Sequence, residues 1–169
     1  MAPGWNLLSF PVGSINSINV PSSAQNTFWV WNPGSQSYLS ITPTPANLNS
    51  GAGTARGFWV FADSAGTISY QGVRADTKTL VLEEGWNLVG LPRQSTLNTS
   101  QLTITNLANS SETIFADAVC DDIPASAPCL AFQYIFFWIG SYANLDASQG
   151  TTLASKRAYW IHAWERSEL

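Results

Sequence analysis

Charged side chains are scarce in this chain, and the scarcity argues against several classes of partner. Lysine and arginine number only 7 in 169 residues, and the formal net charge is −4. Nucleic-acid binding depends on clustered basic residues that neutralise phosphates, so we expect neither DNA nor RNA as a partner. Charged residues make up 11% of the chain, against about a quarter in an average soluble domain. We therefore expect a polar but largely uncharged surface, which is common on extracellular β-proteins.

Long apolar runs are also missing. The sequence contains no stretch of about 18 apolar residues, so it predicts no membrane-spanning helix and no membrane insertion. Its densest apolar segment, 134–139, has the length of a buried strand. Residues 1–3 lead directly into the first motif, without the basic start and apolar run of a signal peptide. If the protein is exported, we expect this sequence to be a mature form or a domain of a longer chain.

Cysteine and histidine are nearly absent, which bears on metal sites and on redox state. Cys120 and Cys129 enclose a short loop that a disulfide closes easily, and they lack the second Cys or His pair of a zinc site. We predict a disulfide, and hence an oxidising compartment, over two reduced and partly buried thiols. The single histidine, His162, is expected to be packed within a strand. We predict no cofactor and no metal site.

Helix signals are weak, whereas strand signals are strong. The 12 Gly and 9 Pro residues interrupt nearly every window of helical spacing. Apolar and aromatic runs are instead separated by turn sequences such as Asn-Pro-Gly-Ser at 32–35. The pattern predicts a helical turn near 46–49 and a hairpin that joins 58–62 to 67–72. The predicted strands are 5–12, a short one near 15–20, 27–31, 38–41, 58–62, 67–72 and 78–82.

The most informative feature is an internal repeat. Gly-Trp-Asn-Leu opens the segment 4–11 and again the segment 85–92, and both segments end in proline. A second matched pair follows each of them, Arg-Gly-Phe-Trp-Val-Phe-Ala at 56–62 and Arg-Ala-Tyr-Trp-Ile-His-Ala at 157–163. Repeats of this kind indicate repeated structural units. We predict an all-β protein of two tandem, pseudo-symmetric halves, each of about five or six short antiparallel strands, packed as a sandwich or barrel-like body.

The two halves, 1–77 and 78–169, differ in length. The interval from Trp86 to Trp138 is twice that from Trp5 to Trp31, and the extra residues fall within 93–133. Insertions on a repeated framework usually form surface loops, where binding sites often lie. We therefore expect the insertion to be a surface loop that holds the two cysteines.

The residue types within the motifs have physical reasons. The glycine before Trp permits a sharp entry into the strand, and the proline ends strand pairing. A buried asparagine must be hydrogen-bonded, so Asn6 and Asn87 are expected to hold a neighbouring turn or strand edge. Arg56 and Arg157 are expected to stack on a Trp face or to pair with a carboxylate.

The Gly-Trp-Asn-Leu segment and the later aromatic-Trp strand resemble repeats of large secreted and cell-surface proteins of bacteria and archaea, which read approximately GWNLI-x-LP…GYWV. The resemblance covers most of the chain, in two copies. The glycine before the closing aromatic pair is Gly57 in the first copy, but Ala158 replaces it in the second. These motifs are structural and carry no catalytic residue. The resemblance implies an extracellular or cell-surface β-domain, often an accessory to a longer chain, and leaves its activity open.

Tryptophan is abundant, with 8 residues in the chain. The repeated positions 5, 59, 86 and 160 are expected to lie in the core. Trp29 and Trp31 share one face of their strand, and Trp164 has no counterpart in the first copy. Exposed Trp and Tyr rings stack well on sugars or anchor protein partners. Our candidate ligand-binding residues are Trp29, Trp31, Tyr38, Tyr142 and Trp164.

Three functions follow from these observations. The first is a non-catalytic binding, adhesion or structural module of a secreted or surface protein, with a glycan as the leading ligand and a surface protein as the other possible partner. The second is a glycosidase-like hydrolase that uses Asp or Glu in a cleft near the insertion. The third is a passive spacer. A Ca²⁺ ion at Asp121-Asp122 is a further option, although the spaced ligands of a calcium loop are lacking. No catalytic residue is predicted.

Overall fold

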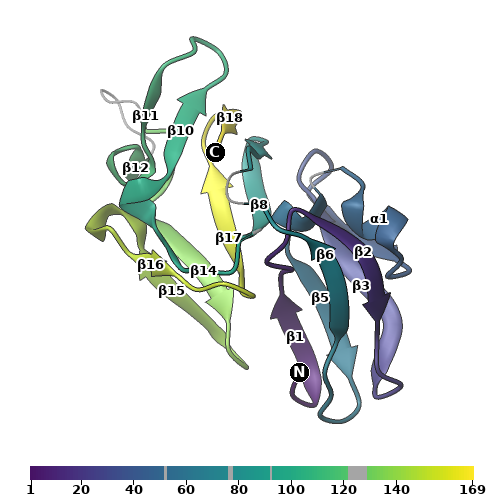
Figure 1. The fold of residues 1–169 in the computed structure, drawn as a ribbon. Coiled ribbons are helices and arrows are strands. Elements are labelled where there is room, and N and C mark those ends of the chain that lie inside the picture. The colour runs from purple at the N-terminus through teal and green to yellow at the C-terminus, as the bar shows by residue number, and fades with distance from the viewer. Residues whose placement is uncertain (52, 76–77, 92, 122–128) are drawn as a thin grey trace.

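The computed structural model describes residues 1–51, 53–75, 78–91, 93–121 and 129–169, and β-strand is the main regular structure among them (Figure 1). The first half contains β1 (Gly4–Leu8), β2 (Ser14–Asn19), β3 (Ala24–Asn32), β4 (Ser37–Ile41), α1 (Pro45–Asn49), a 3₁₀ turn at Gly53–Ala55, β5 (Phe58–Ala62) and β6 (Ser69–Val73). The second half contains β7 (Val81–Leu82), β8 (Gly85–Gly90), β9 (Leu97–Asn98), β10 (Thr103–Asn106), β11 (Glu112–Ile114), β12 (Val119–Cys120), β13 (Ala131–Phe132), β14 (Tyr134–Trp138), β15 (Tyr142–Asp146), β16 (Thr152–Leu153), β17 (Ala158–Ala163) and β18 (Ser167–Glu168), with 3₁₀ turns at Thr99–Gln101, Phe115–Asp117 and Ala147–Gln149.

The repeat is visible in the order of the strands. The first half forms an antiparallel sheet in the order β1-β5-β3-β4, and the second half repeats it as β8-β17-β14-β15. Outside these sheets, β2 pairs with β6 in the first half, and β11, β10, β18 and β7 form a sheet in that order in the second half. Figure 1 shows the two halves side by side, with β8 between β17 and the first half. The predicted all-β fold with two pseudo-symmetric halves is confirmed.

The two motif asparagines make the same contacts in both halves. Asn6 accepts from the amide of Ala2 at 3.0 Å and donates to the carbonyls of Ala2 and Gly4 at 2.8 and 2.9 Å. Asn87 accepts from the amide of Glu83 at 3.0 Å and donates to the carbonyls of Glu83 and Gly85 at 2.7 and 3.0 Å. The prediction that these side chains hold a neighbouring turn is therefore confirmed.

Asn87→Ala is expected to cost more stability than Asn6→Ala, although both remove the same three hydrogen bonds. Asn87 is buried and Asn6 is half-buried, so water replaces the lost bonds more easily at position 6. We expect a loss of about 2 kcal/mol for Asn87→Ala and about 1 kcal/mol for Asn6→Ala in the free energy of unfolding. Urea denaturation of the two single variants measures the difference, and equal losses would show that burial does not set the cost.

Two expectations about strands are wrong. The first strand ends at Leu8 rather than near residue 12, because the Ser9 amide donates to the Lys156 carbonyl of the other half at 3.1 Å. The segments 58–62 and 67–72 do not form a hairpin. β5 is buried along most of its length and pairs with β1 on one side and β3 on the other, whereas the mostly exposed β6 pairs with β2. The strand predicted at 78–82 is reduced to β7.

Each half has its own core, and a third cluster joins them. Phe28, Phe58 and Leu48 of α1 are fully buried in the first half, and Ile104, Phe115 and Ile135 are fully buried in the second. The joining cluster contains the equivalent pairs Leu7 and Leu88, Trp59 and Trp160, packed with Ala158, Trp31, Phe136 and Trp138. The two halves therefore share a hydrophobic interface.

Two reciprocal hydrogen bonds cross this interface. Trp31 Nε1 of β3 donates to the carbonyl of Trp86 at 2.6 Å. At the equivalent place, Trp138 Nε1 of β14 donates to the carbonyl of Trp5 at 3.1 Å. Each half thus inserts one indole against the Gly-Trp-Asn-Leu strand of the other, as a two-fold relation between the halves requires.

The remaining local predictions have mixed outcomes. Cys120 and Cys129 form a disulfide, with their Cα atoms 5.9 Å apart, as predicted. Arg56 and Arg157 lie over Phe58 and Phe137, at 5.4 and 5.1 Å from the ring centroids, rather than over a Trp. The prediction of a surface loop at 93–133 is wrong for its described part, which carries short strands and 3₁₀ turns and places Ile104 and Phe115 in the second core. Residues 122–128 of the insertion lie outside the described ranges. No helix in the described ranges is long and apolar enough to cross a membrane.

Candidate functional site: two aromatic clefts

A cleft of about 500 Å³ lies over the aromatic face of the first sheet. Its floor and walls come from strands β1, β3, β4 and β5, together with the β14–β15 hairpin of the other half. The lining residues are Trp5, Trp29, Tyr38, Trp59, Trp138 and Tyr142. We call it the first cleft. Its volume lies within the range of small-ligand sites.

A second cleft of about 470 Å³ lies over the corresponding face of the second sheet. Its lining residues are Trp31, Tyr38, Trp86, Phe136, Tyr142 and Trp160. The repeat relates these residues to those of the first cleft one by one, since Trp86 corresponds to Trp5, Phe136 to Trp29, Trp160 to Trp59 and Trp31 to Trp138. Tyr38 and Tyr142 correspond to each other and line both clefts.

Strand alternation explains why the aromatic rings face the clefts. In β3, Phe28 and Val30 point into the first core and are buried, whereas Trp29 and Trp31 point to the opposite face. Cross-strand pairing places Trp29 beside Trp59, and Trp31 beside Tyr38. The β14–β15 hairpin repeats the second pairing with Trp138 beside Tyr142. Each sheet therefore presents one continuous aromatic face.

The rings differ in exposure in a way that fits a ligand platform. Trp59 and Trp160 form the buried floors, at 8% and 7% exposure. The residues at the rims are much more exposed to solvent, with exposed fractions of 46% for Trp5, 37% for Trp29, 43% for Tyr38, 36% for Trp86 and 54% for Tyr142. Neighbouring rings are edge-on, with Trp5 and Trp59 at 6.3 Å and Trp86 and Trp160 at 6.3 Å between centroids. Large apolar side chains left open to this extent on a folded protein usually mark a binding surface.

The two clefts differ in one polar contact. Trp59 Nε1 donates to the hydroxyl of Tyr38 at 3.1 Å, but the buried Nε1 of Trp160 has no hydrogen-bond partner. The pKa of the Tyr38 hydroxyl is raised above its ordinary value, chiefly by burial and further by the nearby Tyr142, while the hydrogen bond from Trp59 opposes the rise. The Tyr38 hydroxyl therefore stays a neutral hydrogen-bonding group at physiological pH.

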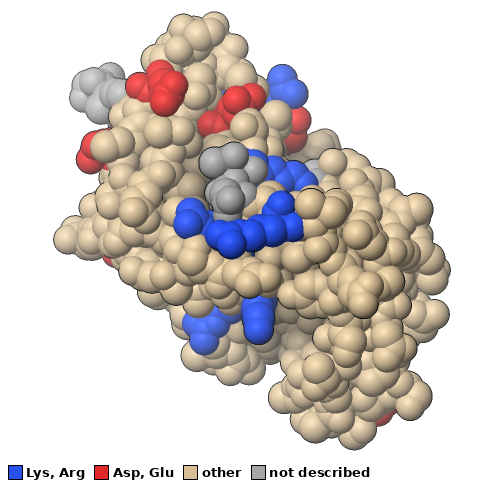
Figure 2. Space-filling model, in the orientation of Figure 1, with Lys and Arg blue, Asp and Glu red and all other residues tan. Residues whose placement is uncertain are grey.

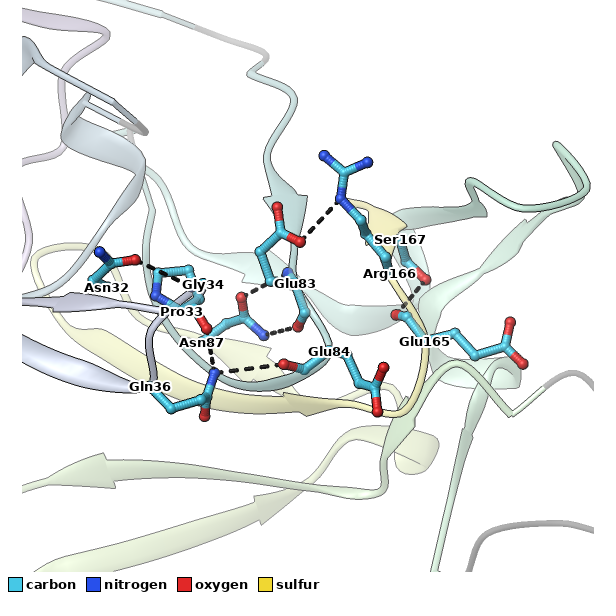
Figure 3. A network of polar contacts seen from close by, with 10 residues as sticks. All are labelled: Asn32, Pro33, Gly34, Gln36, Glu83, Glu84, Asn87, Glu165, Arg166 and Ser167. Carbon is cyan, nitrogen blue, oxygen red and sulfur yellow. Dashed lines mark hydrogen bonds and ion pairs between the residues drawn. The ribbon is translucent and has the colours of Figure 1, made fainter.

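A polar network supports the second cleft from the β3–β4 turn. The Oε1 atom of Gln36 accepts a hydrogen bond from the Trp86 amide at 3.0 Å, and its Nε2 donates to the Trp86 carbonyl at 3.2 Å. Figure 3 shows Gln36 reaching toward Glu84 next to the Asn87 contacts, with Arg166 paired to Glu83 at 3.0 Å. The amide and the carbonyl of Trp86 are thus both bonded to Gln36 of the first half.

Charge is kept away from both clefts. The lining of each, among the residues that the structure describes, is aromatic throughout. Figure 2 shows Lys and Arg gathered near the middle of one face, with most of the visible Asp and Glu above them. Lys78 and Arg93 line a separate cavity of about 440 Å³ between the halves. The clefts are therefore suited to a neutral ligand.

The structure brings together four of the five candidate ligand-binding residues. Trp29, Trp31, Tyr38 and Tyr142 line the clefts, whereas Trp164 packs on His162 and Phe132, at 4.5 and 6.1 Å between centroids. Placing Trp5 and Trp86 in the core was wrong, because they form the open rims. Six further cleft residues were not among the candidates from the sequence: Trp5, Trp59, Trp86, Phe136, Trp138 and Trp160. The repeat was the available signal for two of them, since Phe136 and Trp138 are the counterparts of the candidates Trp29 and Trp31.

The other chemical candidates lie elsewhere. His162 replaces Phe61 of the first half and packs on Trp86 at 5.0 Å, and burial lowers its pKa, partly offset by the charge of Glu84. Of the acidic pair considered for Ca²⁺, Asp122 lies outside the described residues. Within the described ranges no group of three or more His, Cys, Asp or Glu side chains could hold a metal ion.

Comparison with known proteins adds no assignment, because no family model, curated protein or solved structure matches this chain.

Proposed function

We propose that the protein is a non-catalytic binding module of an exported or cell-surface protein, and that its ligand is a carbohydrate held in the two aromatic clefts. The observation that carries the proposal is the pair of symmetry-related clefts lined by half-open Trp and Tyr rings. Sugar rings have apolar C–H faces and hydroxyl edges, so they bind well to rigid rings with polar tips. The Cys120–Cys129 disulfide supports an oxidising compartment.

Binding by stacking is favoured over hydrolysis by the chemistry of the lining. A glycosidase needs two carboxyl groups about 5 to 10 Å apart across its cleft. Each cleft instead presents ring faces and, at the place where the clefts meet, the hydroxyls of Tyr38 and Tyr142. Such groups hold a sugar by stacking and hydrogen bonding, and the described lining of neither cleft includes the carboxyl pair that the usual glycosidase mechanism needs.

The proposal is tested by exposing the purified protein to a panel of soluble and insoluble glycans. Retention is read by depletion, and binding in solution by the change in tryptophan emission. We expect retention on neutral glycans and a loss of about fivefold in affinity for Trp5→Ala, since stacking on one ring is worth about 1 kcal/mol. Trp5 is exposed, so this variant is expected to keep its fold, which near-UV circular dichroism checks.

Trp164→Ala is the matched control, because it removes an indole outside both clefts. It is expected to bind like the unmodified protein. Failure of every glycan to bind would overturn the carbohydrate proposal and leave a protein partner or a structural role. Release of new reducing ends during the incubation would instead establish the hydrolase alternative.

A further inference from the structure

The two clefts meet instead of lying on separate faces. Tyr38 and Tyr142 line both of them, so the two clefts adjoin at these tyrosines. Tyr38 bonds to the floor of the first cleft through Trp59 and packs edge-on against the floor of the second, Trp160, at 6.3 Å between centroids. The rims Trp5 and Trp86 are the outer ends of one aromatic surface.

The surface is nearly the same on both sides of the two tyrosines. Each side has an open Trp rim, a buried Trp floor and an indole contributed by the other half, and the one change of ring type is Trp29 to Phe136. A site with two nearly equivalent sides suits a ligand made of repeating units. An end group or a single sugar would use only one side.

The polar groups of the surface are few, and three of the indole N–H groups already donate to the protein itself. Trp59 Nε1 is bonded to Tyr38, Trp31 Nε1 to the Trp86 carbonyl and Trp138 Nε1 to the Trp5 carbonyl. Recognition therefore depends on apolar ring faces more than on a pattern of hydroxyls. Hexoses whose hydroxyls are equatorial present such C–H faces on both sides.

We infer that the two clefts act as one site for an internal segment of a linear, neutral polysaccharide of equatorially substituted hexoses. This inference rests on the proposed carbohydrate function. One chain crosses the Tyr38–Tyr142 pair and stacks on Trp5 and Trp86 at once. Because occupying the second cleft is then an intramolecular step, affinity rises steeply once the chain is long enough to reach both rims.

The test is calorimetry with neutral oligosaccharides of increasing length, from one sugar upward, taken from a glycan that the protein retains. We expect two short oligosaccharides per protein but one long one, and a dissociation constant that falls by at least about tenfold at the length where the stoichiometry changes. Trp5→Ala and Trp86→Ala are each expected to return the long oligosaccharide to the affinity of the short one.

The results of these binding experiments distinguish the single continuous site from carbohydrate binding in general. If no glycan is retained, both fail. If glycans bind but affinity does not change with length, or if Trp86→Ala leaves the affinity for the long oligosaccharide unchanged, the single continuous site is wrong while carbohydrate binding stands. An affinity for charged glycans equal to that for neutral ones of the same length would overturn the preference for neutral chains.

Discussion

Trp160→Ala is expected to lower the free energy of unfolding by about 4 kcal/mol, which is the cost of removing a large buried ring from a packed cluster. Trp160 packs on Trp31 of the other half at 5.1 Å and on Trp86 at 6.3 Å between centroids, within the cluster that joins the halves. The measurement is urea unfolding followed by circular dichroism. A loss below about 1 kcal/mol would mean that the cluster contributes little to stability.

Phenylalanine variants separate the packing of the two equivalent floor residues from their hydrogen bonding. Trp59→Phe removes the bond to Tyr38, whereas Trp160→Phe removes a buried N–H that has no partner. Losing an unsatisfied buried donor costs little, so Trp59→Phe should be the more destabilising of the two by about 1 kcal/mol. If Trp160→Phe were the more costly, a partner of its Nε1, such as an ordered water, would have to exist.

The repeat made most of the fold predictable. Matching the two Gly-Trp-Asn-Leu segments implied equivalent strands, and the strand order β1-β5-β3-β4 does recur as β8-β17-β14-β15. Period-two alternation in β3 correctly placed Trp29 and Trp31 on one face. The hairpin 58–62 to 67–72 was wrong because local turn residues favoured it, while the buried β5 needs a partner strand on each side.

The clefts could be predicted only in part, because they form between the halves. Alternation separates the two faces of a strand, but it does not show which face meets the other half or how far along the strand that contact extends. Leu7 and Trp5 share a face of β1, yet Leu7 is buried at the junction and Trp5 is open beyond it. The contribution of Trp138 and Tyr142 to the first cleft depends on the same long-range packing.

Packing at the interface between the halves explains one difference between the two copies of the repeat. Gly57 and Ala158 are equivalent in sequence and face each other across the interface, where the Gly57 amide donates to the Leu88 carbonyl at 3.0 Å. A Cβ at position 57 would overlap the Cβ of Ala158 and come within 2.6 Å of Leu88 Cγ. The approach of the two backbones leaves room for one methyl group between them. The repeat therefore carries glycine in one copy and alanine in the other.

Gly57→Ala is accordingly expected to lower the free energy of unfolding by about 2 to 3 kcal/mol, an overpacking cost at a site where the backbone is fixed by the cross-half hydrogen bond. Gly34→Ala is the matched control, since a Cβ there has as its nearest neighbour Asn32 Oδ1 at an ordinary 3.5 Å. It should change stability by less than about 0.5 kcal/mol.

The exchange of the two residues is the decisive variant. Ala158→Gly alone is expected to cost about 1 kcal/mol through a more flexible unfolded chain. Combined with Gly57→Ala it removes the nearest clashing atom, so the double variant should be more stable than Gly57→Ala alone by about 1 kcal/mol. Additive losses would mean that the side chains at positions 57 and 158 do not compete for the same space. The close contact between the halves at these positions would then be wrong, and the joined clefts depend on that packing.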